Sequence, residues 1–145
     1  MVTTGRVEEY HRIIRSIVDW AQERDDIVGI AVVGSWARDE PRMSSDVDLV
    51  VLTAHKARYV SGDAWVSEAI GGHGEIVRIQ AWGPLTEFRV ALSSGLEIEF
   101  GFVAPDWGTT EPLDPGTAGV VRDGCAPLYD PEGAFDALIA AAGRP

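Results

Sequence analysis

The spacing of apolar positions divides the first half of the chain into predicted helices and strands. Between residues 6 and 23 apolar residues recur every three or four positions, which indicates an amphipathic helix. Residues 27–33 form a nearly continuous apolar run rich in β-branched side chains, which is typical of a buried strand. Residues 46–53 are predicted to form a second strand, and residues 55–70 a helical region with a break near residues 61–63.

Shorter apolar runs separated by turn residues fill the second half. Strands are predicted over residues 75–82, 86–92 and 96–103, and Ser93-Ser94-Gly95 favours a hairpin between the last two. A loop, a short helix, a short strand and a terminal helix are predicted over residues 104–115, 116–122, 126–129 and 132–142. This order predicts an α+β fold, a small mixed β-sheet with helices packed mainly on one face. We expect a single domain over residues 1–145.

Two carboxylates interrupt the second predicted strand. Asp46 and Asp48 lie two positions apart, so they point from the same face, roughly 6 to 7 Å apart along the strand. Two acids on an otherwise apolar strand repel each other and resist desolvation, and a divalent cation would remove that penalty. Oxygen ligands alone favour Mg²⁺ or Mn²⁺ over zinc.

A later strand can supply a third acid. Within residues 96–103 the polar face carries Glu97 and Glu99, and either can complete the site if this strand lies beside the Asp46 strand. A glutamate flanked by apolar residues, as Glu99 is, is unusual unless it has a function. The three histidines are scattered and have no metal-ligand spacing.

A small-residue turn comes directly after the first strand. The Gly34-Ser35 pair allows the backbone to approach a phosphate closely, and Arg38 and Arg42 can add charge-assisted contacts. Each feature has an ordinary explanation, namely a simple turn, a solvated strand end or local ion pairs. The ordered combination of turn, paired acids and third acid favours a functional site.

Composition excludes several classes of function. The net charge is −11, from 23 acidic and 12 basic residues, and without a basic cluster this disfavours DNA or RNA as the main partner. The acidic balance is most simply explained by solubility, although it would also steer a cationic substrate. One cysteine permits no internal disulfide, and no apolar run is long enough for a membrane span. The start has no signal-peptide pattern, so we expect a cytoplasmic protein without membrane attachment.

Together these residues resemble the DNA polymerase β-like nucleotidyltransferase superfamily, whose signature is Gly-Ser, a gap, Asp-x-Asp and a later third acid. The segments 34–38 and 45–49 fit closely, and the ten-residue gap is similar to that of minimal nucleotidyltransferases. That group includes antitoxins paired with HEPN toxins and resembles aminoglycoside nucleotidyltransferase catalytic domains. The core motifs lie within residues 27–103, and Asp39 stands where many relatives carry glycine.

The resemblance implies a nucleotidyltransferase fold and a Mg²⁺-dependent transfer of a nucleoside monophosphate to a hydroxyl acceptor on a small molecule or protein. AMP from ATP is the expected donor reaction, although the residues do not distinguish ATP from other nucleotides. The implied catalytic and metal-binding residues are Asp46, Asp48 and Glu99, with Glu97 in reserve. The implied nucleotide-binding residues are Gly34, Ser35 and Arg38.

An alternative implied by the same resemblance is an antitoxin-like subunit that binds a HEPN-type toxin, with or without AMPylating it. Residues 106–145 are too few for the helical acceptor domain of aminoglycoside-modifying relatives. We therefore expect a partner chain to complete the acceptor site or a protein to be the acceptor, and a homodimer is compatible with both. Trp82 and Trp107 lie near predicted strand ends, where they either stack on a base or acceptor or simply pack.

Overall fold

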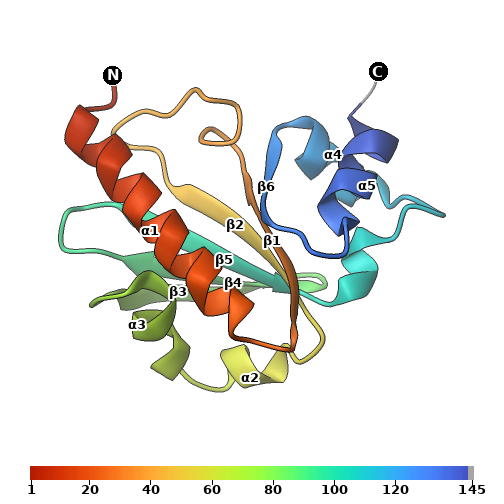
Figure 1. Ribbon diagram of the computed structural model, residues 1–145, viewed down its shortest axis with the longest axis horizontal. Helices are drawn as coiled ribbons and strands as arrows, with labels where there is room; N and C mark the ends of the chain where they lie inside the picture. Colours follow the sequence, from red (N-terminus) through yellow and green to blue (C-terminus); the bar gives the residue numbers. More distant parts are fainter. Residues whose placement is uncertain (144–145) are drawn as a thin grey trace.

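The first half of the chain forms the helices and central strands that the apolar spacing predicts. The computed structural model describes residues 1–143 (Figure 1). Its first elements are α1 (Thr4–Gln22), β1 (Ile27–Val33), β2 (Val47–Thr53), α2 (Ala57–Val60) and α3 (Ala64–Ile70). The break between α2 and α3 lies where the sequence predicts it, around Gly62.

The second half contributes three more sheet strands and then a C-terminal group of short elements. The strands are β3 (Glu75–Trp82), β4 (Leu85–Ala91) and β5 (Glu97–Val103). They are followed by η1 (Pro105–Gly108), α4 (Pro115–Arg122), β6 (Cys125–Tyr129) and α5 (Ala134–Ala142). The predicted elements are confirmed to within one or two residues at their ends. The short 3₁₀ helix η1 lies in a segment predicted as loop.

All six strands belong to one mixed sheet, in the order β3-β4-β5-β2-β1-β6. Only the β2–β5 pair is parallel, and the other neighbouring pairs are antiparallel. The parallel register places Asp48 beside Glu99, and the antiparallel β4–β5 register places Arg89 on the other side of Glu99. This sheet confirms the predicted α+β class.

One face of the sheet carries the larger core and is covered by α1, α2 and α3 (Figure 1). Alternate residues of β2 and β5 point into this core, among them Val47, Leu49, Ile98 and Phe100, all fully or almost fully buried. Trp65 of α3 packs edge-on against Phe100 and neighbouring rings. Because strand side chains alternate, Asp48 and Glu99 must point to the opposite face.

A second layer covers part of that opposite face. Helices α4 and α5 pack against β1, β2 and the end of β5, and Phe135 and Leu138 of α5 are fully buried there. In Figure 1 these two helices lie on the right, away from α1. The sequence pattern placed helices mainly on one face, and this smaller layer on the other face forms one wall of the acidic site.

A side chain of α1 joins two loops that are far apart in the sequence. Arg6, in the first turn of α1, donates to the carbonyl oxygens of Met43 and Ser94 at 3.1 Å each, and so ties the β1–β2 loop to the β4–β5 turn.

Within the described residues, no helix has both the length and the hydrophobicity needed to cross a bilayer.

Candidate active site

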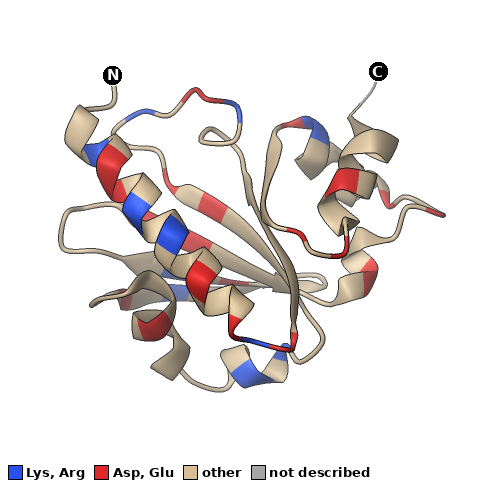
Figure 2. Cartoon of the chain, viewed as in Figure 1, with Lys and Arg blue, Asp and Glu red and all other residues tan. Residues whose placement is uncertain are grey.

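Three acidic side chains converge at the end of the sheet where β2 and β5 begin. Asp46 precedes β2, Asp48 is its second residue, and Glu99 lies beside Asp48 on β5. One oxygen from each of the three lies within 4.8 Å of the other two. Figure 2 shows acidic positions along β2 and both signs of charge on the loop that joins β1 to β2. The juxtaposition predicted from strand alternation is therefore present.

The acids lie close enough for Asp46 and Glu99 to act on the protonation of Asp48. Burial of Asp48, together with hydrogen bonding to Glu99 and the charges of Glu99 and Asp46, raises the pKa of the Asp48 carboxyl to about 8. Partly buried carboxylates at this spacing are stable together when a cation joins them, and a set of oxygen donors only is one that Mg²⁺ or Mn²⁺ accepts. The residues present thus fit a divalent metal site.

Arg89 of β4 lies among the acids and was not singled out from the sequence. Its Nη1 donates to Asp46 Oδ2 at 2.9 Å and to Glu97 Oε1 at 2.6 Å, and its Nη2 donates to Glu99. Hydrogen bonding to Glu97 and the charges of Glu99 and Asp46 raise the pKa of Arg89 above its usual value, so the guanidinium stays charged. The alternation of the β4 strand puts Arg89 on its polar face, but the strand order is needed to place it beside the acids.

Glu97 and Glu99 occupy different places in this arrangement. Glu99 is in register with Asp48, and its side chain is 19% exposed. Glu97 is in register with Ala91, is 34% exposed and is held by Arg89. The compact group of three acids contains Glu99 and not Glu97. This geometry favours Glu99 as the third acid, and the role itself stays a prediction.

Gly34 is fixed by the position of Asp48. Its backbone has a φ of +76°, and a Cβ atom at this position would lie 2.9 Å from Asp48 Oδ2. Glycine is the residue that meets both requirements. Asp39 has a φ of 59°, a left-handed conformation that glycine adopts more readily than other residues.

The turn after Gly34 leaves backbone donors available. Arg38 N–H donates to Gly34 O at 3.1 Å, and Glu40 N–H to Ser35 O at 2.9 Å. Within residues 1–143, the amides of Ser35, Trp36 and Ala37 donate no hydrogen bond. Successive free amides of this kind form a concave anion site, so the turn can hold phosphate oxygens. The predicted nucleotide-binding roles of Gly34 and Ser35 are compatible with this geometry and stay predictions.

Arg38 is engaged elsewhere in the structure. Its Nη1 donates to the carbonyl oxygen of Asp123 at 2.8 Å and to Asp123 Oδ2 at 3.0 Å. This contact joins the turn after β1 to the turn between α4 and β6. A phosphate contact by Arg38, as predicted, would need the side chain to leave or share Asp123.

A cavity of about 400 Å³ adjoins the acids. Its floor is the sheet face formed by β2, β5 and β4, and its wall is formed by η1 and α4. It reaches Asp48 and Glu99 at one end and Trp82 at the other, with Trp107 in the wall. The acids therefore open directly into a space of small-molecule size.

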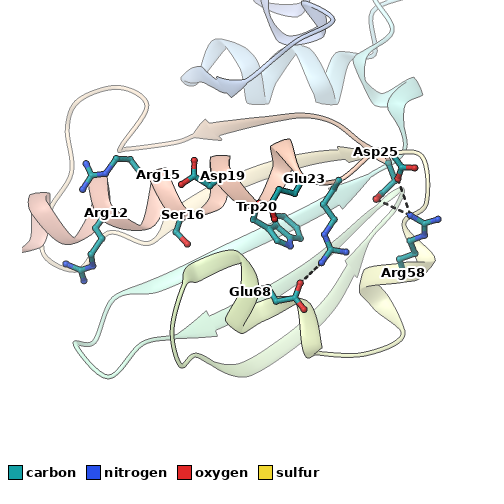
Figure 3. A pocket seen from close by; sticks show the side chains of 11 residues that line it. Arg12, Arg15, Ser16, Asp19, Trp20, Glu23, Asp25, Arg58 and Glu68 are labelled. Carbon is teal, nitrogen blue, oxygen red and sulfur yellow. Dashed lines mark hydrogen bonds and ion pairs between the residues drawn. The ribbon is translucent and has the colours of Figure 1, made fainter.

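A larger hollow, of about 960 Å³, lies on the other side of the sheet, between α1, α2 and α3 (Figure 3). Some of its charged side chains form ion pairs, as Arg24 does with Glu68 at 2.6 Å and Arg58 with Asp25 at 3.6 Å. This hollow lies on the face away from Asp48 and does not include the three converging acids, so we place the candidate active site at the acids.

A comparison with family models identifies the domain to which the site belongs. Residues 12–93 match the nucleotidyltransferase domain family, which is more than half of the 145-residue chain. The chain belongs to this family. The match includes the Gly34-Ser35 turn and both aspartates, and it ends before Glu99.

Solved structures show the same fold. The structure of Cid1 with the UTP analogue UMPNPP has a TM-score of 0.51 at 15% identity, over 70% of this chain and 31% of that chain. A cytoplasmic RNA terminal U-transferase gives a TM-score of 0.51 at 14% identity, over 70% of this chain and 30% of that chain. The chain thus spans about a third of the length of these proteins. A comparison with curated proteins finds no match.

Proposed function

We propose that this chain catalyses metal-dependent nucleotidyl transfer, moving a nucleoside monophosphate, AMP from ATP in the simplest case, to a hydroxyl group. The observation that carries the proposal is the convergence of Asp46, Asp48 and Glu99 within 4.8 Å beside the Gly34-Ser35 turn. Membership of the nucleotidyltransferase domain family supports the same reaction class.

Each part of the site has a distinct task in this reaction. Asp46, Asp48 and Glu99 would hold Mg²⁺ or Mn²⁺, which when bound supplies charge stabilisation at the transferring phosphoryl group and lowers the pKa of the attacking hydroxyl. The free amides of residues 35–37 bind the outer phosphate oxygens and orient the α-phosphate over the acids. The acceptor oxygen then forms a bond to the α-phosphorus, the bond to the bridging oxygen breaks, and pyrophosphate leaves.

The donor base is left to experiment. One of the similar structures holds a UTP analogue, and at 15% identity that likeness carries the fold alone. The purified protein is incubated with Mg²⁺ and each of four labelled nucleoside triphosphates, with cell lysate, an aminoglycoside panel or a co-expressed partner as acceptor. We expect label transfer from ATP that Asp46→Asn with Asp48→Asn abolishes.

The matched control replaces two acids on the helical side, Asp19→Asn with Asp25→Asn. Both side chains are exposed and lie away from the candidate site, so this pair changes the net charge equally and keeps transfer intact. Equal transfer by both double variants would exclude the proposed role of the acids.

A second candidate is an antitoxin-like subunit that binds a HEPN-type partner. The observation that favours it is the edge strand β3, where Val77 and Ile79 are 50% and 58% exposed. An unpaired edge with exposed apolar residues suits strand addition or docking by another protein. Co-expression with a HEPN partner tests this candidate. We expect the two wild-type proteins to co-purify and Ile79→Lys to abolish co-purification, and separate elution of the two wild-type proteins would contradict it.

A further inference from the structure

The cavity beside the acids is built partly by residues outside the family match. Trp107 of η1 and Asp114, Thr117 and Val120 of the α4 region line its wall, and all follow residue 93, where the match ends. Function resides in particular sites rather than in a fold as a whole, and residues outside the matched range can serve a substrate particular to this chain. The location of these residues therefore suggests a role with the acceptor rather than with the nucleotide.

Two tryptophans give the cavity its aromatic surface. Trp82 is 54% exposed although its ring is held in place, since its indole N–H donates to Glu87 Oε2 at 3.0 Å. Glu87 in turn pairs with Arg78 at 2.5 Å. A fixed aromatic ring with an exposed face suits stacking on a flat apolar ligand. Trp107 of η1 also lines the cavity.

The charge of the cavity selects against anions. Its lining includes the carboxylates of Glu87 and Asp114 in addition to Asp48 and Glu99, and no lysine or arginine among the described residues lines it. Arg78 pairs with Glu87 and Arg89 with Glu99 from outside the lining, and the carboxylates here still outnumber these two cations. Donor phosphates are therefore disfavoured inside the cavity, whereas the free amides of the Gly34-Ser35 turn suit them. An ammonium group would be attracted by the acids and by the net charge of −11.

We propose, resting on the nucleotidyl transfer proposed above, that this cavity binds the acceptor, a small hydroxyl-bearing amine with a flat aromatic body. The ring lies between Trp82 and Trp107, and the hydroxyl points toward Asp48 and Glu99. In the transfer the hydroxyl oxygen bonds to the α-phosphorus, the hydroxyl proton passes to solvent, and pyrophosphate leaves with the electrons of the broken bond. The C-terminal segment thus contributes acceptor specificity within this chain.

The test uses three phenols that share one body and differ in charge: tyramine, which is cationic, tyrosol, which is neutral, and phloretic acid, which is anionic. Binding to the full-length protein is measured by NMR titration without metal or nucleotide. We expect saturable millimolar or tighter binding of tyramine, weaker binding of tyrosol, and binding of phloretic acid weaker than tyramine by roughly tenfold or more.

A matched pair of variants locates the binding. Val120 in the cavity wall and Val60 of α2 on the other face are 39% and 38% exposed, so tryptophan fits at both without disturbing the core. Val120→Trp fills the cavity and should weaken tyramine binding roughly tenfold or more. Val60→Trp should leave the affinity unchanged.

Several outcomes would overturn the inference. It is contradicted if tyramine fails to bind saturably, if phloretic acid binds as tightly as tyramine, or if Val120→Trp leaves the affinity for tyramine unchanged. Displacement of tyramine by adenosine also contradicts it, because the cavity would then bind the nucleotide base. Mg²⁺-dependent ATP binding is measured on the same wild-type sample. If ATP binds and tyramine does not, the acceptor inference fails alone. If ATP does not bind, the proposed function fails and the acceptor role fails with it.

Discussion

Arg89 separates carboxylates that would otherwise repel one another. It contacts Asp46, Glu97 and Glu99 directly, and its side chain is only 22% exposed. A fixed guanidinium at this point offsets negative charge in the metal-free protein, and the same positive charge opposes an arriving divalent cation. The Arg89 guanidinium and a divalent metal ion therefore compete for the same carboxylate oxygens.

Removing the charge of Arg89 should shift that competition. We expect Arg89→Met to bind Mn²⁺ about five- to tenfold more tightly than the wild type, and to be less stable in the presence of a chelator, because the acids lose their internal partner. Calorimetric Mn²⁺ titration and thermal unfolding with EDTA measure the two effects. Arg89→Lys serves as the control that keeps the charge, and weaker Mn²⁺ binding by Arg89→Met would contradict this account.

Gly34 offers a second test at the residue scale. A methyl group there would meet the Asp48 carboxylate at 2.9 Å and would sit on a backbone with φ of +76°. Gly34→Ala should cost about 1–2 kcal/mol of stability from the backbone. It should lower transfer about 100-fold, because Asp48 is displaced. Denaturant unfolding and transfer rates measure these changes.

The control for this substitution is Gly62→Ala. Gly62 has open space around its Cβ direction and no left-handed φ, so its replacement should leave transfer unchanged. Full transfer activity in Gly34→Ala would show that the close contact with Asp48 is not needed.

At the scale of elements, Asp26, which directly precedes β1, contacts β2 and α2 at the end of the sheet away from the acids. It is 3% exposed, and it accepts hydrogen bonds from Thr53 Oγ1 at the end of β2 and from Tyr59 Oη in α2, at 2.8 and 2.5 Å. Arg58 also contacts it at 3.2 Å. Burial acts to raise the pKa of Asp26, but the hydrogen bonds from Tyr59 and Thr53 and the Arg58 charge outweigh it, so the pKa is lowered.

This depressed pKa gives a stability that depends on pH. Because the folded pKa lies below the unfolded value of about 4, the charged form stabilises the fold above that pH, and the contribution is lost as pH falls through the folded pKa. Asp26→Asn should reduce the unfolding free energy by about 1–3 kcal/mol near neutrality, and the difference from wild type should shrink in acid. Chemical denaturation over a pH series measures it.

The neighbouring Asp25 provides the control, since its side chain is 95% exposed. Asp25→Asn should change stability little at any pH. A wild-type to Asp26→Asn difference that persists unchanged below the folded pKa would contradict the assigned ionisation.

The elements themselves were largely predictable, because each depends on local periodicity. The alternation in residues 96–103 predicts both the strand and its acidic face, and the structure confirms both. The place of Arg89 was not predictable in this way, because it requires knowing that β4 pairs with β5 in that register. The face of the sheet that α4 and α5 cover was not predictable either. Apolar residues such as Phe135 and Leu138 predict that a helix is buried on one side, but they do not show which face of the sheet it packs against.

At the scale of the whole molecule, the sheet separates two environments. The helical face with α1, α2 and α3 holds the main core, and the other face carries the acids and the cavity, walled by α4 and η1. The sequence predicts a donor site at the Gly34-Ser35 turn and the acids, and it predicts that a partner chain completes the acceptor site or that the acceptor is itself a protein. The cavity suggests instead that the C-terminal segment supplies at least part of it.

The central claim is tested most directly by calorimetry. ATP is titrated, with and without Mg²⁺, into the wild type and into the double variant Asp46→Asn with Asp48→Asn. The account predicts saturable ATP binding to the wild type that requires Mg²⁺ and is lost in the double variant, while Asp19→Asn with Asp25→Asn binds as the wild type does. Binding of ATP that is independent of Mg²⁺, or is equal in the Asp46 and Asp48 double variant, would contradict it.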